Sequence, residues 1–238
     1  MLPSPIAPGL VLVPALALLL AAPHACARSV FQARCEDAAA RAEPGFSSRD
    51  NGWRIDNSLS YRTLTEMKRP RVSRGYVLGL TRTESHVTVR VDGSMLQDPL
   101  SGNECVVPHI DVTLYYQPIV VYVGREFAPG SCAYEEILAH ETRHLKSYLD
   151  YLPIVEDRVR VKLGGRYRGR PIYAQAGQAR ELLQREIDVN WLPYIRSEMA
   201  RIEGMQAAID SPQEYARLSK VCQGEVQSLI GSTRHTRS

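Results

Sequence analysis

The order of the sequence patterns predicts an α+β protein, with a β-rich N-terminal half and a helical C-terminal half. Between residues 75 and 124, apolar residues alternate with polar ones, as in half-buried strands. After Pro129-Gly130 the apolar spacing changes to the period of an amphipathic helix. Strands followed by helices in one chain are typical of the α+β class.

Residues 1–27 are expected to be a signal peptide that is removed on export. They contain no Lys, Arg, Asp or Glu, and their apolar run GLVLVPALALLLAA is short for a membrane span. Ala25-Cys26-Ala27 fits the small-x-small cleavage rule, which would leave Arg28 as the first mature residue. Lipid attachment at Cys26 is the less favoured alternative. The chain is therefore predicted to be secreted or periplasmic, with no stable membrane span after removal of the leader.

The mature chain is long enough for a single domain over residues 28–238. Its β-rich half is expected over 28–130 and its helical half over 131–238. The formal net charge is only +3 and no basic block is present, so nucleic acid is not an expected partner. The polar stretch 29–74 reads as loops and turns, and an inhibitory prosegment would explain it equally well.

Three strand-like runs follow this polar stretch. In the second of them, His86, Thr88 and Arg90 alternate with valines before Asp92-Gly93 closes the run. Pro118 lies inside the third run, where it requires an edge position, a bulge or a break between two strands. The runs are GYVLGL (75–80), HVTVRV (86–91) and IDVTLYYQPIVVYVG (110–124).

The helical half contains three long helical stretches and a short final one. The first is expected over 131–152, with Pro153 as a stop or kink, and a Gly- and Arg-rich loop follows it. The next two are expected over 174–192 and 194–209. Asp210-Ser211-Pro212 then reads as the cap of the final helix.

Four cysteines remain after loss of the leader, and an even number in an exported chain predicts two disulfides. Three pairings are possible, and a bridge between Cys105 and Cys132 is favoured because both flank the same strand-rich stretch. The chain has no C-x-x-C pair, which argues against a zinc site built from thiolates. The four residues are Cys35, Cys105, Cys132 and Cys222.

The stretch HETRH, residues 140–144, matches the H-E-x-x-H pattern of zinc peptidases. A spacing of four residues places His140 and His144 on one helix face, one turn apart, where both can bind one ion. On a helical projection Glu141 lies on the same, largely apolar side, whereas Arg143 lies on the charged side and points to solvent. The pattern therefore predicts a metal site rather than two histidines packed in a core.

A third protein ligand is required, and two carboxylates are candidates. Asp150 imitates an extended zinc-peptidase pattern, but Ser147 stands where that pattern needs a glycine to turn the chain. Glu186 lies in the middle of an apolar helix stripe, with Asn190 one turn further on. Glu186 is therefore the favoured third ligand, with Asn190 expected to orient it from outside the ligand set. An ion pair with a buried arginine would explain Glu186 equally well.

HETRH on a helix, followed by an inward-facing Glu on a later helix, resembles the gluzincin metallopeptidases. The arrangement of leader, β-rich half, Cys105 ahead of a strand, HETRH and late Cys222 resembles a bacterial family of secreted zinc-dependent proteases. The resemblance spans about residues 75–225, and HETRH is its only specific motif. It implies a zincin-like fold and one Zn²⁺ per chain.

The chemistry implied is hydrolysis of a peptide bond in a peptide or protein substrate. His140, His144 and Glu186 would hold the zinc, and Glu141 would act as general base toward the attacking water. The run YYQPIVVYVG is the expected edge strand for an extended substrate, and Tyr167 and Tyr173 are candidates for stabilising the oxyanion. The alternatives are a non-catalytic, exported module that binds an envelope component, and a zinc amidase acting on cell-wall peptides. The zinc content of the purified protein distinguishes the first alternative from the peptidase. Substrate profiling on peptides and muropeptides distinguishes the second.

Overall fold

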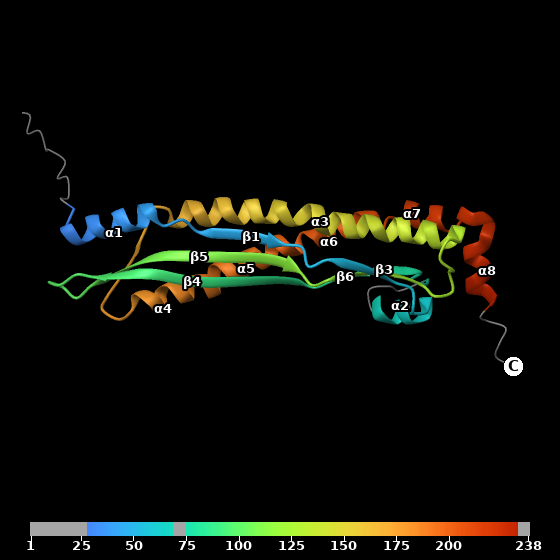
Figure 1. The fold of residues 1–238 in the computed structure, drawn as a ribbon, viewed down its shortest axis with the longest axis horizontal. Helices are drawn as coiled ribbons and strands as arrows, with labels where there is room; N and C mark the ends of the chain where they lie inside the picture. Colours follow the sequence, from blue (N-terminus) through green and yellow to red (C-terminus); the bar gives the residue numbers. More distant parts are fainter. Residues whose placement is uncertain (1–27, 69–74, 233–238) are drawn as a thin grey trace, which may run out of the picture.

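A computed structural model describes residues 28–68 and 75–232. It confirms a mixed α+β fold, with strands concentrated in the N-terminal half and helices in the C-terminal half (Figure 1). The proposed signal peptide, residues 1–27, lies outside the described residues. Within the described ranges, no helix is both long and apolar enough to cross a membrane.

The larger sheet is built around strand β5 (Glu104–Tyr116). It pairs in parallel with β1 (Gly45–Arg49) and antiparallel with β4 (Ser85–Gln97) over the whole length of β4. The short strand β7 (Ile172–Ala174) also pairs with the beginning of β5. Strand β4 therefore continues past Asp92-Gly93, where the sequence had predicted its end.

Each strand of the smaller sheet lies next in sequence to a strand of the larger one. The centre of the smaller sheet is β6 (Ile119–Val123), which lies between β2 (Trp53–Asp56) and β3 (Gly79–Arg82). Pro118 forms the break between β5 and β6, one of its three predicted roles. The expectation that YYQPIVVYVG forms an edge was wrong, because β5 and β6 are paired on both sides. The edges next to β6 are β2 and β3.

Helix α3 (Cys132–Tyr167) lies along both sheets (Figure 1). Ser131 caps its first turn, as a Ser at this position is expected to do. The helix does not end near Pro153, and it includes the first part of the predicted loop. Buried side chains on the sheet-facing stripe continue beyond the proline, and their packing outweighs the hydrogen bond that proline cannot donate. Beyond the proline they are Val155, Val159 and Leu163.

The remaining chain returns in the opposite direction along α3 (Figure 1). Its helices are α4 (Ala179–Glu186), a π-helical turn (Ile187–Trp191), α5 (Leu192–Ala200) and α6 (Ile202–Ile209). Ser211 then caps α7 (Pro212–Leu218), as predicted, and a 3-10 turn (Val221–Gly224) leads into α8 (Glu225–Ser232). This return path carries Asp210 back to the first half of α3.

The polar N-terminal stretch is more ordered than the sequence predicted. It contains α1 (Val30–Arg41) and α2 (Tyr61–Lys68) in addition to β1 and β2. A complete capping box between Ser29 and Gln32 begins α1. Because β1 and β2 pair with the central strands, this stretch is part of the fold.

Helices α3, α4 and α5 pack on one face of the long sheet, whereas α1 packs on the other face at the start of β5. Alternate residues of β5, including Ile110, Val112 and Leu114, are buried against α3, α4 and α5, whereas His109 on the other face is exposed. One face therefore forms the core, and the opposite face of β5 carries partly exposed polar side chains.

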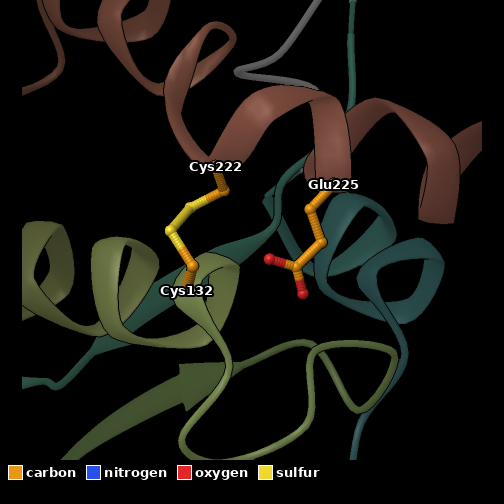
Figure 2. Close-up of side chains that lie close together, drawn as sticks. All are labelled: Cys132, Cys222 and Glu225. Atoms are coloured by element: carbon orange, nitrogen blue, oxygen red, sulfur yellow. A yellow bond between two sulfur atoms is a disulfide. The ribbon is translucent and has the colours of Figure 1, made fainter.

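The predicted number of disulfides is confirmed, but the favoured pairing was wrong. Cys35 on α1 bonds Cys105 at the start of β5, and Cys132 at the start of α3 bonds Cys222 (Figure 2). Packing brings together cysteines that are far apart in the sequence, so proximity to the same strands was misleading. Two disulfides are typical of a protein that folds in an oxidising, extracellular-type environment.

Candidate metal centre

Helix α3 presents His140 and His144 on one buried face, as the sequence predicted. His140 is 4% exposed and His144 is 6% exposed. The Nε2 atoms of the two rings lie 3.2 Å apart. Two imidazoles therefore point toward the same place from successive turns of the helix.

Asp210 completes the group from the link between α6 and α7. Its Oδ1 atom lies 3.2 Å from Nε2 of His140 and 3.2 Å from Nε2 of His144. Together the three atoms form a triangle with equal sides. Among the described residues, this group of two histidines and one carboxylate is able to hold a metal ion.

The outer nitrogens of both histidines have acceptors of their own. Gln206 on α6 places its side-chain oxygen against Nδ1 of His144, and its amide nitrogen lies 2.7 Å from the hydroxyl of Ser147. Glu214 on α7 places a carboxylate oxygen 3.3 Å from Nδ1 of His140. In the metal-free protein an Nε2–H can donate to Asp210, but when each Nδ1 donates its proton to these partners, both Nε2 atoms are left with free lone pairs.

The centre then consists of two nitrogen lone pairs and a carboxylate oxygen, all facing one another. Three acceptors at this separation need a cation or a shared proton between them. Burial lowers the pKa of His144, but the hydrogen bond with Asp210 and the charge of Glu141 outweigh it, so its pKa is raised. The arrangement therefore favours positive charge at this point, which either a proton or a metal ion can supply.

Lys68 makes a further contact with Asp210 from the end of α2. Its ammonium group lies 3.0 Å from Oδ2, the carboxylate oxygen that does not face the histidines. Burial raises the pKa of Asp210, but hydrogen bonds from His140, His144 and Lys68 outweigh it and hold that pKa well below its usual range. Asp210 is thus kept ionised, as a metal ligand must be.

Glu141 lies on the side of α3 that packs against the edge strand β3. Its residue is 5% exposed, and the hydroxyl of Thr81 lies 2.9 Å from its Oε2 and 2.9 Å from its backbone oxygen. Burial raises the pKa of Glu141, although the nearby histidines act in the opposite direction. A carboxyl group with a raised pKa beside a candidate metal centre is suited to accepting and returning a proton.

Gly79 allows β3 to lie this close to the helix. A Cβ atom at this position would lie 2.7 Å from Cγ of Glu141 and 2.7 Å from Cγ2 of Ile137. These distances are too short for a side chain, so the strand can pack here only with glycine.

Replacing Gly79 by alanine is expected to destabilise the fold by about 1–3 kcal/mol, the usual cost of overpacking. The added methyl group would displace either β3 or the Glu141 side chain. Urea unfolding followed by circular dichroism measures the change. Gly165→Ala in α3 is the matched control, because a Cβ there has no atom within 4 Å. Equal stability of Gly79→Ala and the wild type would show that β3 does not press on Glu141.

The helical projection predicted that Arg143 points to solvent, but in the structure it also contacts the candidate centre. Its side chain is 48% exposed, but its guanidinium group forms an ion pair with Glu214 and lies 3.0 Å from Nδ1 of His140. Arg217 on α7 pairs with the same glutamate and with Glu136 on α3. Hydrogen bonds from Arg217 in the first place, and from Arg143, lower the pKa of Glu214 to about 2. The residue that looked irregular in HETRH therefore helps to hold α7 beside the centre.

The favoured third ligand, Glu186, lies elsewhere. Its carboxylate accepts hydrogen bonds from Arg166 at 3.1 and 3.2 Å and faces the indole nitrogen of Trp191 at 3.4 Å. It is not among the residues grouped around His140 and His144. The ion pair with Arg166 explains why a carboxylate lies on this apolar stripe, as the alternative prediction held.

The other predicted residues are also remote from the centre. Asn190, which was expected to support Glu186, is exposed, and so is Asp150. Tyr167 packs against Trp191, and Tyr173 packs against Phe31 on α1. Neither tyrosine therefore has the surroundings expected for oxyanion stabilisation.

The sequence analysis missed Asp210, Gln206 and Glu214 as site residues. Asp210 was noticed only as part of a helix cap. A usable signal was present, because Gln206 and Asp210 are four residues apart and flank the apolar run Ala207-Ala208-Ile209 at the end of the helix. Two polar groups on one face of such a helix indicate a shared buried partner.

A second group able to hold a metal consists of Cys132, Cys222 and Glu225 (Figure 2). Here the two sulfur atoms are bonded to each other, and Glu225 accepts a hydrogen bond from the backbone of Ala133 at 3.1 Å. The group therefore fastens the start of α3 to the C-terminal helices.

These observations define an α+β protein with two disulfides and a buried group suited to a metal ion. No protein-family model matches the chain, and neither a curated protein nor a solved structure matches it.

Proposed function

We propose that this chain is an exported, zinc-dependent peptidase with a zincin-like site. The observation that carries the proposal is the equal triangle formed by His140, His144 and Asp210, with the buried carboxylate of Glu141 one residue along the same helix. In this proposal Asp210 takes the place that the resemblance to gluzincins gives to a glutamate.

The geometry fits zinc. Ligand atoms about 2.0–2.1 Å from a tetrahedral zinc ion lie about 3.3–3.4 Å from one another, and the three atoms here are 3.2 Å apart. Two nitrogens and one carboxylate oxygen are a donor set typical of catalytic zinc, in which the fourth position is left for water. Gln206 and Glu214 provide the hydrogen bonds that orient ligating histidines in such sites.

Zinc bound at such a site lowers the pKa of a water molecule and polarises the scissile carbonyl. Glu141 would accept the proton of the attacking water and later donate it to the leaving amine. Thr81 can serve both states of Glu141. It donates to the ionised carboxylate, and it accepts from the protonated carboxyl while donating to the backbone oxygen of Glu141.

Tyr215 replaces Tyr167 and Tyr173 as the candidate for stabilising the oxyanion. Its ring centroid lies 6.3 Å from that of His140, and its residue is 48% exposed. Burial, followed by the negative charge of Asp210, raises the pKa of its hydroxyl. The phenol therefore keeps its proton and can donate a hydrogen bond to developing negative charge.

Strand β3 replaces YYQPIVVYVG as the edge that would hold the substrate. Among the described residues it pairs only with β6, and Thr81 connects it to Glu141. An extended peptide paired with this edge would pass beside the general base.

Two measurements test the proposal. Protein purified without added zinc should contain about one zinc ion per chain, and it should hydrolyse an unfolded protein such as reduced, carboxymethylated α-lactalbumin. A chelator should abolish the hydrolysis, and added zinc should restore it. Protein without zinc would contradict the metal site, whereas zinc-loaded protein without hydrolysis would favour the non-catalytic binding module.

A further inference from the structure

The outer edge of the sheet continues well beyond the candidate centre. Strand β3, next to Glu141, is followed after only two residues by β4, and both lie on the same side of the central β5–β6 path. Among the described residues β4 pairs only with β5, so its other side offers unpaired backbone groups along thirteen residues. An edge of this length is able to bind another extended chain.

A groove follows this edge on the side of the helices. It consists of two neighbouring cavities of about 340 and 390 Å³ between β4 and the segment from α4 to α5. Val87 and Arg196 line both cavities. We call this feature the β4 groove, which is lined by Val87, Val89, Val91, Asp188, Leu192 and Arg196.

The floor of the groove is apolar. Val87, Val89 and Val91 pair in register with the buried residues Leu114, Val112 and Ile110, so they lie on the core face of the sheet, yet they are only partly covered. A peptide strand added to β4 would place every second side chain on the same face of the sheet, beside these valines. The groove therefore suits a chain with apolar residues at alternate positions.

The rim of the groove carries an exposed arginine, Arg196. No carboxylate among the described residues pairs with it. Asp188, at the far cavity, already accepts a hydrogen bond from Gln184 at 3.1 Å. The charge of Arg196 favours a carboxylate on the bound chain at the cavity nearer to the centre.

We propose that the β4 groove binds an extended, unfolded segment of the protein substrate, with an acidic side chain of that segment paired to Arg196. This inference rests on the proposed peptidase function, because the edge leads to Glu141. Addition of an antiparallel strand, the commoner pairing, places the groove on the N-terminal side of the cleaved bond. Thr81 and Val87 are six positions apart along the edge, so the acidic residue is expected about six residues before that bond.

Binding can be measured without catalysis. Glu141→Gln protein is titrated into fluorescein-labelled, reduced, carboxymethylated α-lactalbumin, and fluorescence anisotropy gives the Kd. Adding Arg196→Glu should raise this Kd about tenfold, since the reversal removes an exposed ion pair and adds a repulsion of similar size. Zinc content should stay the same. Arg180→Glu is the matched control, since Arg180 is an exposed arginine on α4 that does not line the groove.

Two further readouts make the result decisive. Hydrogen exchange should slow at the amides of residues 85–91 when the probe binds. In digests by the active protein, acidic residues should be enriched about six positions before the cleaved bonds, and Arg196→Glu should replace them with basic ones. Equal Kd values for Arg196→Glu and Arg180→Glu, or unprotected β4 amides, would overturn the groove proposal even if zinc and hydrolysis were present.

A second copy of the chain is the competing occupant. Light scattering that showed a dimer, with the β4 amides already protected in the absence of the probe, would assign the edge to self-association and overturn the proposal. Absence of hydrolysis together with retained, Arg196-dependent binding would instead contradict the peptidase function and leave the groove assigned.

Discussion

Asp210→Asn is expected to lower the zinc affinity of the protein by more than about 100-fold, beyond the roughly 10–100-fold effect typical of residues that only hydrogen-bond to a metal ligand. The substitution keeps the size of the side chain but removes the charge and weakens the donor that faces Nε2 of both histidines. Competition with a chromophoric chelator measures the affinity, and circular dichroism confirms that the variant folds.

Glu186→Gln is the matched control, because it makes the same chemical change at the carboxylate that the sequence favoured. It should leave zinc affinity unchanged, since Glu186 pairs with Arg166 away from the centre. Its effect should be confined to a modest loss of stability, because both partners are partly exposed. Loss of zinc in Glu186→Gln, with retention in Asp210→Asn, would restore the sequence-based assignment and contradict the structural one.

The two histidines could be predicted because their geometry is local. Four residues along one helix fix the relative positions of His140 and His144 whatever the rest of the fold does. The burial of Glu141 also followed from the helical period. These are properties of a single helix, and the structure retains them.

The third member of the group could not be found in the same way. Asp210 lies 66 residues after His144, and only the return of α4, α5 and α6 along α3 brings it back. The packing of α6 against α3 depends on side chains throughout both helices, which no short pattern encodes. Glu186 illustrates the corresponding error, because an apolar stripe shows that a carboxylate needs a partner but does not say which.

Errors in the fold have related causes. The helix was expected to stop at Pro153 because proline cannot donate one backbone hydrogen bond. This prediction took no account of the buried stripe that continues to Leu163. The favoured Cys105–Cys132 bridge assumed that neighbours in sequence are neighbours in space, whereas α1 brings Cys35 to Cys105. The edge strand was misplaced because strand order is set by long-range pairing, and a proline marks only a local break.

Glu141→Gln is expected to reduce kcat for hydrolysis of the unfolded probe by about 10²–10⁴-fold, the usual contribution of a general base. The amide keeps the shape of the side chain and can still bind Thr81, but it cannot accept the proton of the attacking water. Zinc affinity should change little, because Glu141 is not one of the three grouped ligands.

Glu135→Gln is the control for this change, since Glu135 is exposed in the first turn of the same helix. It should retain both zinc and activity. Metal analysis and initial rates on the same preparations separate the possible causes of a defect. Full activity of zinc-loaded Glu141→Gln would remove Glu141 from the reaction, whereas joint loss of zinc and activity would give it a structural role at the centre. Loss of activity with zinc retained is the result that general-base catalysis by a buried carboxylate requires.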